Sequence, residues 1–175
     1  MNKFNIAILA LVSLASCLSN PVNHLTSASA LAQTNNSRLQ RLNLSLENTK
    51  LTLLAPKGSK IIESPLAWGT IEIKSGNGKN FHLELQITTN QNIITEVKKF
   101  IQDNDVNILK RFLIDSPDSL LYESSPGMNI LEYNLYTYKN LGNIAITCEN
   151  AKGNLFSESE ARLMLESCRS ITSQP

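Results

Sequence analysis

Alternation of apolar and polar residues between positions 68 and 88 constrains the fold of this chain more than any other feature. In the segment 81–88 every second residue is apolar, so these residues share one face of an extended strand. They are Phe81, Leu83, Leu85 and Ile87. The segment 68–74 alternates in the same way, and the intervening residues 75–79 are typical of a tight turn. The pattern predicts a β-hairpin with one apolar face that other elements must cover.

Further β-strands are predicted on both sides of this hairpin. Short runs of β-branched, aromatic and leucine residues end at Pro, Gly, Asn or Asp residues that favour turns. The expected strands are 51–55, 60–63, 108–114, 119–123, 128–138 and 141–148. For 108–114 the helical period is also partly met, and the turn at 115–118 favours the strand. The segment 37–46 fits either a short helix or an entering strand.

Two segments have the apolar spacing of amphipathic helices that pack on a sheet. In 91–103 apolar residues recur at i, i+1, i+4, i+7 and i+8, opposite a polar face. They are Ile93, Ile94, Val97, Phe100 and Ile101. Before the segment 158–170, Ser157 and Glu160 have the spacing of a capping box. The residues expected to be buried on this second helix are Ala161, Met164, Leu165 and Cys168.

The order of these predicted elements resembles that of the PsbP/Mog1-like group of small α/β/α sandwiches. N-terminal strands, a hairpin, a helix, an antiparallel meander and a closing helix follow one another over residues 42–172. The segments Asn104–Asn107, Pro117–Glu123 and Met164–Ser167 are also similar to segments of uncharacterised bacterial lipoproteins. The resemblance implies an α+β fold with a mostly antiparallel sheet and two packing helices. It implies no particular activity, because one fold hosts unrelated functions.

The N-terminus has the pattern of an export signal. A basic residue precedes the apolar run 6–14, which is far shorter than the roughly 20 residues that a membrane-spanning helix needs. The sequence Leu-Ala-Ser-Cys at 14–17 resembles the lipobox of bacterial lipoproteins. The resemblance implies a diacylglycerol thioether on Cys17, cleavage just before it and N-acylation of the new amine. The alternatives are an ordinary secretory signal cut at 28–30 or 30–32, and a cysteine without this role.

Export and lipidation divide the chain into three expected parts. Residues 1–16 are the signal peptide, and residues 17–41 are the lipidated N-terminus with a flexible tether rich in Ser, Asn, Ala and Thr. Residues 42–175 form a single globular domain. Acylated Cys17 makes the membrane a partner, on the extracytoplasmic side of a bacterial cell envelope. Leu18 stands where some bacteria use an aspartate for inner-membrane retention, which favours the outer membrane.

The charge balance argues against nucleic acid as a partner. Lys and Arg number 16 against 15 Asp and Glu, and loss of Lys3 with the signal leaves 15 of each. A neutral chain gains little from the electrostatic attraction that draws proteins to nucleic acid or to anionic lipid.

Cys148 and Cys168 are the two thiols that remain if Cys17 carries lipid. Cys148 shares a strand face with Ile144 and Ile146, and Cys168 lies on the apolar stripe of the last helix. Both therefore face the same layer, and the oxidising side of a membrane permits a disulfide between them. Two separate buried thiols are the alternative, because cysteine also serves as a small core residue.

No catalytic, metal or cofactor site is expected from the sequence. Neither His24 nor His82 has a second nitrogen or sulfur ligand at useful spacing, and no G-x-S-x-G turn is present. The segment 103–107 matches the first half of a calcium loop, but Ile108 and Ile114 replace the glycine and glutamate that the loop requires. A polar turn that ends the helix is the preferred interpretation.

Tyr136 and Tyr138 belong to a group of tyrosines on the predicted meander strands and lie two residues apart. Cross-strand packing is the preferred interpretation, and an exposed docking face is the alternative.

These observations favour a lipid-anchored, non-enzymatic domain that acts as a binding or assembly accessory, with a protein of the cell envelope as its partner. A second hypothesis is a small-molecule or lipid-binding module with a pocket between sheet and helices. A third, a hydrolase, requires His82 to lie within hydrogen-bond reach of a serine and an acid.

Overall fold

The computed structural model describes residues 38–63, 69–127 and 130–174, which form two antiparallel β-sheets and two helices. The first strands are β1 (Leu39–Leu46), β2 (Thr49–Pro56), β3 (Ser59–Glu63), β4 (Thr70–Ser75) and β5 (His82–Thr88). The later strands are β6 (Ile108–Asp115), β7 (Ser119–Ser125), β8 (Glu132–Asn140), β9 (Ala145–Asn150) and β10 (Thr172–Ser173). The helices are α2 (Ile93–Gln102) and α3 (Glu158–Arg169). The predicted α+β class, with a mostly antiparallel sheet and two helices, is confirmed.

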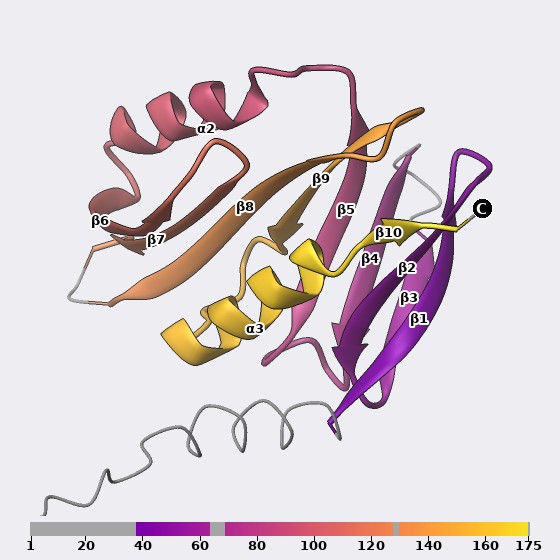
Figure 1. Cartoon of the computed structure of the whole chain (residues 1–175). Helices are drawn as coiled ribbons and strands as arrows, with labels where there is room; N and C mark the ends of the chain where they lie inside the picture. The colour runs from indigo at the N-terminus through magenta and orange to yellow at the C-terminus, as the bar shows by residue number, and fades with distance from the viewer. Residues whose placement is uncertain (1–37, 64–68, 128–129, 175) are drawn as a thin grey trace, which may run out of the picture.

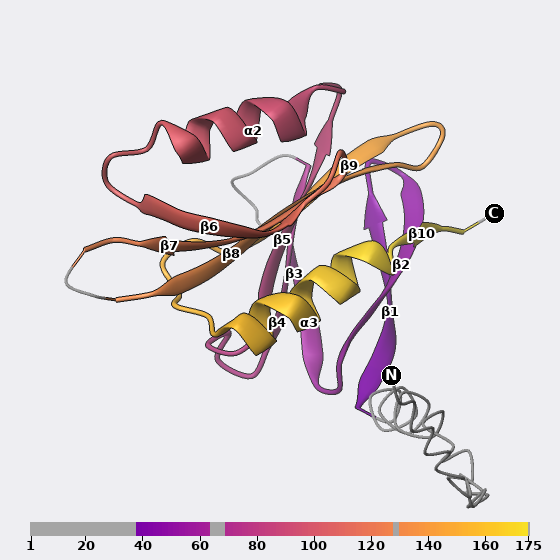
Figure 2. The same ribbon diagram turned by 60° about the vertical axis from the view of Figure 1, so that its left-hand side comes forward.

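The elements are stacked in layers around a central sheet of seven strands. Its order is β3-β4-β5-β9-β8-β7-β6, and each neighbouring pair is antiparallel. On one face α2 contacts β6, β7 and β8 (Figure 1). On the other face lie α3 and a second sheet in the order β1-β2-β10 (Figure 2). The two faces therefore bury two separate apolar clusters.

The predicted hairpin is present as β4 and β5. Ile71 pairs with Leu85 and Ile73 with Leu83, and none of these side chains is more than 3% exposed. Phe81, just before β5, is 1% exposed. Complete burial of such side chains stabilises a fold by about 1.5–3 kcal/mol each. Because β1, β2 and α3 cover this apolar face, the side chains of the hairpin form one side of the larger core.

The start of α3 confirms the predicted capping box. The Ser157 hydroxyl accepts a hydrogen bond from the backbone N–H of Glu160, and the Glu160 carboxylate accepts one from the backbone N–H of Ser157 at 2.8 Å. The predicted inward side chains are all buried, namely Ala161, Met164, Leu165 and Cys168. The cap satisfies backbone donors that the first turn leaves free, and the apolar stripe holds the helix on the sheet.

A disulfide joins Cys148 of β9 to Cys168 of α3, across a Cα–Cα distance of 5.9 Å. Both residues are 1% exposed, so the bond lies inside the larger core. The predicted pairing is therefore confirmed, and the alternative of two separate thiols is wrong. The bond ties the closing helix to the central sheet.

The apolar face of α2 is narrower than predicted. Ile94 and Ile101 are buried and Val97 is half-buried, but Phe100 is 69% exposed. At 3.6 residues per turn, Phe100 lies about 120° around the helix from Ile94. Since α2 lies mainly on β6, β7 and β8, its buried stripe does not extend as far as Phe100. The prediction that Phe100 packs on the sheet is wrong.

Several strands begin at other residues than predicted, because turns and pairing partners determine where a strand starts. β1 begins at Leu39, before the expected domain boundary at residue 42, and is a strand rather than a helix. β8 begins at Glu132 rather than 128. β9 begins at Ala145 rather than 141, because Leu141 donates to the Ile144 carbonyl in a turn. The short β10, which pairs with β2, was not predicted.

Several predictions fall outside the described residues. They are the signal peptide 1–16, Cys17, the tether up to residue 37 with His24, and Trp68. Within the described ranges, no helix is long and apolar enough to cross a membrane.

Candidate functional site

Exposed large apolar side chains gather at one end of the molecule. Among the described residues, six such side chains have exposed fractions from 37% to 78%. They are Phe100, Val106, Ile108, Ile130, Leu131 and Leu155. They come from the end of α2, the α2–β6 loop, the start of β6, the β7–β8 connection and the segment before α3. We call these six residues the apolar end.

Strand pairing brings these separate segments together. Ile108, at the start of β6, is opposite the last residue of β7, and Ser124 of β7 is opposite Glu132 at the start of β8. The backbone N–H of Tyr133 donates to the carbonyl of Phe156 at 3.3 Å, which brings the segment before α3 to the same place. Figure 1 shows these connections at the left side of the molecule. Exposed apolar side chains that lie together are common at interaction surfaces, so the apolar end is the candidate site.

A polar cavity of about 150 Å³ opens beside the apolar end, between α2, its following loop and the strands β7, β8 and β9. Its polar lining residues are Asn104, Asn107, Ser124, Glu132, Asn134, Glu149, Asn150 and Lys152. Its apolar lining residues are Phe100, Ile101, Tyr122 and Leu135. Because Phe100 belongs to both features, the apolar end continues into the cavity. We call this cavity the polar pocket.

One wall of the polar pocket is fixed by a chain of hydrogen bonds. The Ser124 hydroxyl donates to Glu132 Oε1 at 3.0 Å, and the Asn134 amide donates to the same oxygen at 3.2 Å. The Asn150 amide donates to Asn134 Oδ1 at 2.9 Å. Asn150 Oδ1 accepts from the backbone N–H of Leu135 at 2.7 Å. These bonds hold the polar side chains in place and occupy Glu132 Oε1.

Glu149 is the carboxylate of the pocket that has no such partner. Among the described residues no hydrogen bond reaches its side chain, although burial is the main cause that raises its pKa above the ordinary value of 4.5. Lys152 lowers this pKa, and Glu84 raises it because it lies directly opposite on β5. Two like charges directly opposite each other on neighbouring strands destabilise the sheet. The fold therefore keeps a carboxyl group in a position that disfavours its charge.

Burial also acts on the tyrosine beside Glu149. Tyr122 lines the pocket from β7, and its pKa lies well above the usual range because of burial, with a smaller contribution from the charge of Glu149. Its phenol stays protonated at every ordinary pH. The pocket thus combines a poorly solvated carboxyl group with aromatic side chains.

The loop at the pocket mouth confirms the interpretation of residues 103–107 as a helix-ending turn. Asn104 Oδ1 accepts hydrogen bonds from the backbone N–H groups of Val106 and Asn107, at 2.9 and 2.8 Å. Asn side chains often stabilise turns in this way. In the ranges that the structure describes, no group of three or more His, Cys, Asp or Glu residues is placed to hold a metal ion.

Tyr136 and Tyr138 lie on one face of β8, as their spacing predicts, but this is the face that packs with α2. Both side chains are half-buried and adjoin the apolar cluster of α2. Burial raises the pKa of Tyr136. Both tyrosines pack against the apolar cluster of α2, and each keeps an exposed part of its side chain.

His82 has partners other than those a hydrolase needs. Its Nε2 lies 3.0 Å from Glu72 Oε2, and its Nδ1 lies 3.4 Å from the Asn154 amide nitrogen. No serine hydroxyl is bonded to the ring within the described part of the chain. The acid of the third hypothesis is thus beside His82, and among the described residues no serine joins the pair.

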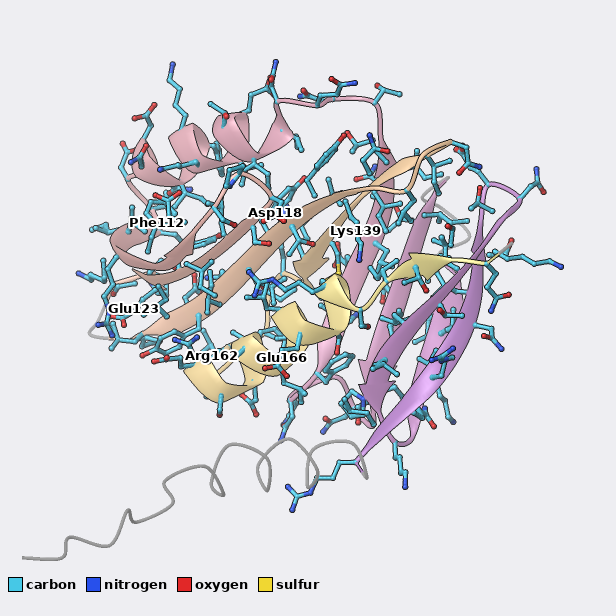
Figure 3. All side chains as sticks on the ribbon, viewed as in Figure 1. Phe112, Asp118, Glu123, Lys139, Arg162 and Glu166 are labelled. Atoms are coloured by element: carbon cyan, nitrogen blue, oxygen red, sulfur yellow. A yellow bond between two sulfur atoms is a disulfide. The ribbon has the colours of Figure 1, made fainter. Side chains whose placement is uncertain are left out.

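Glu123 is a buried carboxylate at this end that pairs with an arginine. Glu123, which is labelled in Figure 3, is 8% exposed. Its Oε2 accepts hydrogen bonds from Arg111 Nε and Nη2, at 3.1 and 2.9 Å. This pair joins β6 to β7, so its role is to hold the two strands together. Glu123 is not among the residues that line the polar pocket.

Sequence reasoning missed both the apolar end and the polar pocket. The residues that form them come from four separate stretches of the chain, so no local motif connects them. One signal was present, since Val106, Ile130 and Leu131 are large apolar residues in segments otherwise rich in turn-forming residues. No protein family model, curated protein or solved structure matches this chain. Its function therefore has to be inferred from the geometry of this end.

A stability measurement tests the environment of Glu149. We expect Glu149→Gln to be more stable than wild type at pH 7, because the folded state disfavours the charged carboxylate. A raised pKa in the folded state gives stability that is present below about pH 4.5 and is lost as the pH rises through the folded pKa. In urea unfolding between pH 4 and 7, the free energy of unfolding of the variant should fall less with rising pH than that of wild type. Glu166→Gln, an exposed change on α3, is the matched control. A variant that is less stable than wild type at pH 7 would contradict the prediction.

Proposed function

We propose that this chain is a bacterial lipoprotein with a PsbP/Mog1-like α/β/α domain that acts as a non-enzymatic binding or assembly accessory in the cell envelope. The lipobox-like sequence ending at Cys17 supports the anchor. The placement of α2 on one face of the central sheet, and of α3 on the other, supports the domain class. The internal disulfide fits an oxidising compartment outside the cytoplasm.

The observation that carries the proposal is the apolar end. Its six side chains are exposed, whereas many other large apolar side chains of the described residues are buried in two clusters. Interfaces commonly have an apolar centre with a few polar groups that fix the partner. The adjoining pocket contains two carboxylates, Glu132 and Glu149, against one lysine, Lys152. The partner that fits this surface is an envelope protein that presents apolar side chains together with a basic group.

The anchor leaves this surface free to meet a partner. About 20 residues separate Cys17 from Arg38, and a chain of this length spans at most about 70 Å when fully extended. The domain begins at β1, on the sheet that covers the opposite face from α2. The membrane is thus a fixed partner through Cys17, with the outer membrane favoured, and the apolar end is a second binding surface.

A second candidate function is supported by a hollow of about 430 Å³ between α3 and the ends of β1 and β2. Arg38, Leu39, Pro56 and Leu163 are among its lining residues. Its volume is in the range of small-molecule sites, roughly 300–1,000 Å³. This hollow is where a small molecule or lipid would bind if the domain were a ligand-binding module.

Site-specific photo-cross-linking in the native host tests the proposal. We expect a photoreactive amino acid at Val106 to give one discrete protein adduct, identified by mass spectrometry. The same amino acid at Asn143 is the control, because Asn143 lies in the β8–β9 turn at the far end of β8, about 27 Å from its start. The Val106 adduct should disappear in a Leu131→Asp background whose unfolding curve is unchanged. No adduct at Val106, or equal adducts at both positions, would overturn the proposal and favour the ligand-binding alternative.

A further inference from the structure

We propose that the polar pocket receives a basic side chain of the protein partner, an arginine guanidinium or a lysine ammonium group, and that Glu149 is the carboxylate that pairs with it. This inference rests on the proposed function and names the group of the partner that the pocket recognises. Four features of the described residues support it, namely the available carboxylate, the pocket's charge, its size and its position beside the apolar end.

Of the two carboxylates among the described residues that line the pocket, Glu149 is the one whose side chain accepts no hydrogen bond. Glu132 Oε1 already accepts from Ser124 and Asn134, whereas no hydrogen bond to Glu149 is found in the described part of the chain. The cost of burying an unpaired carboxylate falls sharply when a cation pairs with it. Burial and Glu84 both raise the pKa of Glu149. A bound guanidinium or ammonium group would oppose both effects, because it stabilises the charged carboxylate. A cation in the pocket would therefore add to the favourable effect that Lys152 already has on the charged form of Glu149.

The charge of the lining selects a basic group over an acidic one. Two carboxylates and one ammonium group line the pocket, and the third carboxylate, Glu84, lies opposite Glu149 on β5. Lys152 is exposed and is not within salt-bridge distance of any acid that the structure describes. Lys152 therefore does not occupy the position of the expected cation. The aromatic side chains of Phe100 and Tyr122 also favour cations, which are attracted to ring faces.

The size of the pocket suits the end of one side chain. Its volume of about 150 Å³ equals that of about five water molecules in the liquid. This space is too small for a typical organic cofactor, because such sites occupy roughly 300–1,000 Å³. A bare metal ion is disfavoured, because no group of three metal-ligating residues is found in the described ranges.

The position of the pocket favours a partner's side chain over a free small cation. Phe100 lines the pocket and belongs to the apolar end, so a partner docked on that surface covers the pocket mouth. Exclusion of water by surrounding apolar contacts strengthens an ion pair at the centre of an interface. One basic residue flanked by apolar residues is the complement of this surface.

Two capped tripeptides test the inference, acetyl-Leu-Arg-Leu-amide and its citrulline counterpart, which has nearly the same shape without the charge. Each is titrated into the full-length protein in detergent, with the backbone amide signals of Ser124, Asn134 and Asn150 followed by NMR. We expect the arginine peptide to shift these signals and to bind at least tenfold more tightly than the citrulline peptide. Glu149→Gln should remove this preference, and Glu166→Gln, on α3, should keep it (Figure 3).

The outcomes separate this inference from the proposed function. Equal binding of both peptides, or an unchanged preference in Glu149→Gln, would overturn the assignment of the pocket to a basic side chain. The Val106 adduct is scored independently, so its presence in that case would leave the docking proposal intact. A reduced yield of this adduct in Glu149→Gln, with an unchanged yield in Glu166→Gln, would support both. Shifts confined to signals outside the pocket would also overturn the inference.

Discussion

Loss of the Cys148–Cys168 disulfide is expected to lower the free energy of unfolding by about 3 kcal/mol. The bond closes a loop between residues that are 20 positions apart, and in the chain-entropy model this restricts the unfolded chain. The loop contains the end of β9, the connection to α3 and most of the helix itself. Reduction therefore releases the helix that covers one face of the central sheet. Urea unfolding of the purified full-length protein, with and without reductant, measures the effect.

A double variant provides the control for this experiment. Cys148→Ala together with Cys168→Ala avoids placing hydroxyl groups in the core, where both residues are 1% exposed. Its unfolding midpoint should lie well below that of the oxidised wild type and should not respond to reductant. At a slope of about 1–3 kcal/mol per molar urea, the expected loss shifts the midpoint by roughly 1–3 M. Identical curves for oxidised and reduced wild type would contradict the prediction.

The features that sequence predicted well are those determined by local periodicity. The β4–β5 hairpin follows from alternation around a turn, and the capping box of α3 follows from residues three apart. The disulfide was predictable because Cys148 and Cys168 each lie on an apolar face of an element that was itself correctly assigned. In each case a pattern within one or two elements determines which side chains are buried.

The features that sequence missed depend on contacts between distant segments. Phe100 fits the helical spacing, but its exposure depends on how much of the sheet α2 covers. The second sheet is completed by β10, which pairs with β2 although the two strands are more than 100 residues apart in the chain. Periodicity determines the direction of a side chain relative to its own element. It does not determine which neighbour, if any, lies in that direction.

The polar pocket illustrates how such contacts create a site. On β9, the buried Cys148 faces the larger core and its neighbour Glu149 faces the α2 side. Sequence alone indicates an ordinary alternating strand, in which the polar residue is solvated. The fold instead places Tyr122 and Asn134 around Glu149 and a second carboxylate, Glu84, across from it. A residue held in a position that disfavours its charge is a common property of functional sites.

Replacement of Cys17 by alanine is expected to abolish acylation of this protein completely. The chain has three cysteines, and the other two form the disulfide, so Cys17 is the remaining thiol for lipid attachment. Each buried acyl CH₂ contributes about 0.8 kcal/mol to membrane binding, and two or more chains are needed for stable anchoring. Metabolic labelling with an alkyne fatty acid, followed by purification, measures the effect. Wild type should carry the label and the variant should carry none.

Two matched variants separate the role of Cys17 from that of its signal sequence. The double variant Cys148→Ala with Cys168→Ala should keep the fatty-acid label, because it leaves Cys17 intact. A chain with Cys17→Ser behind a conventional cleavable signal should fractionate with soluble proteins, since the domain then has no acyl chains. The intact mass of the wild-type protein, extracted from membranes, should correspond to a chain that begins at acylated Cys17. A mass that begins at Leu31 or Gln33 would contradict the lipoprotein assignment, because such a chain has lost Cys17 altogether.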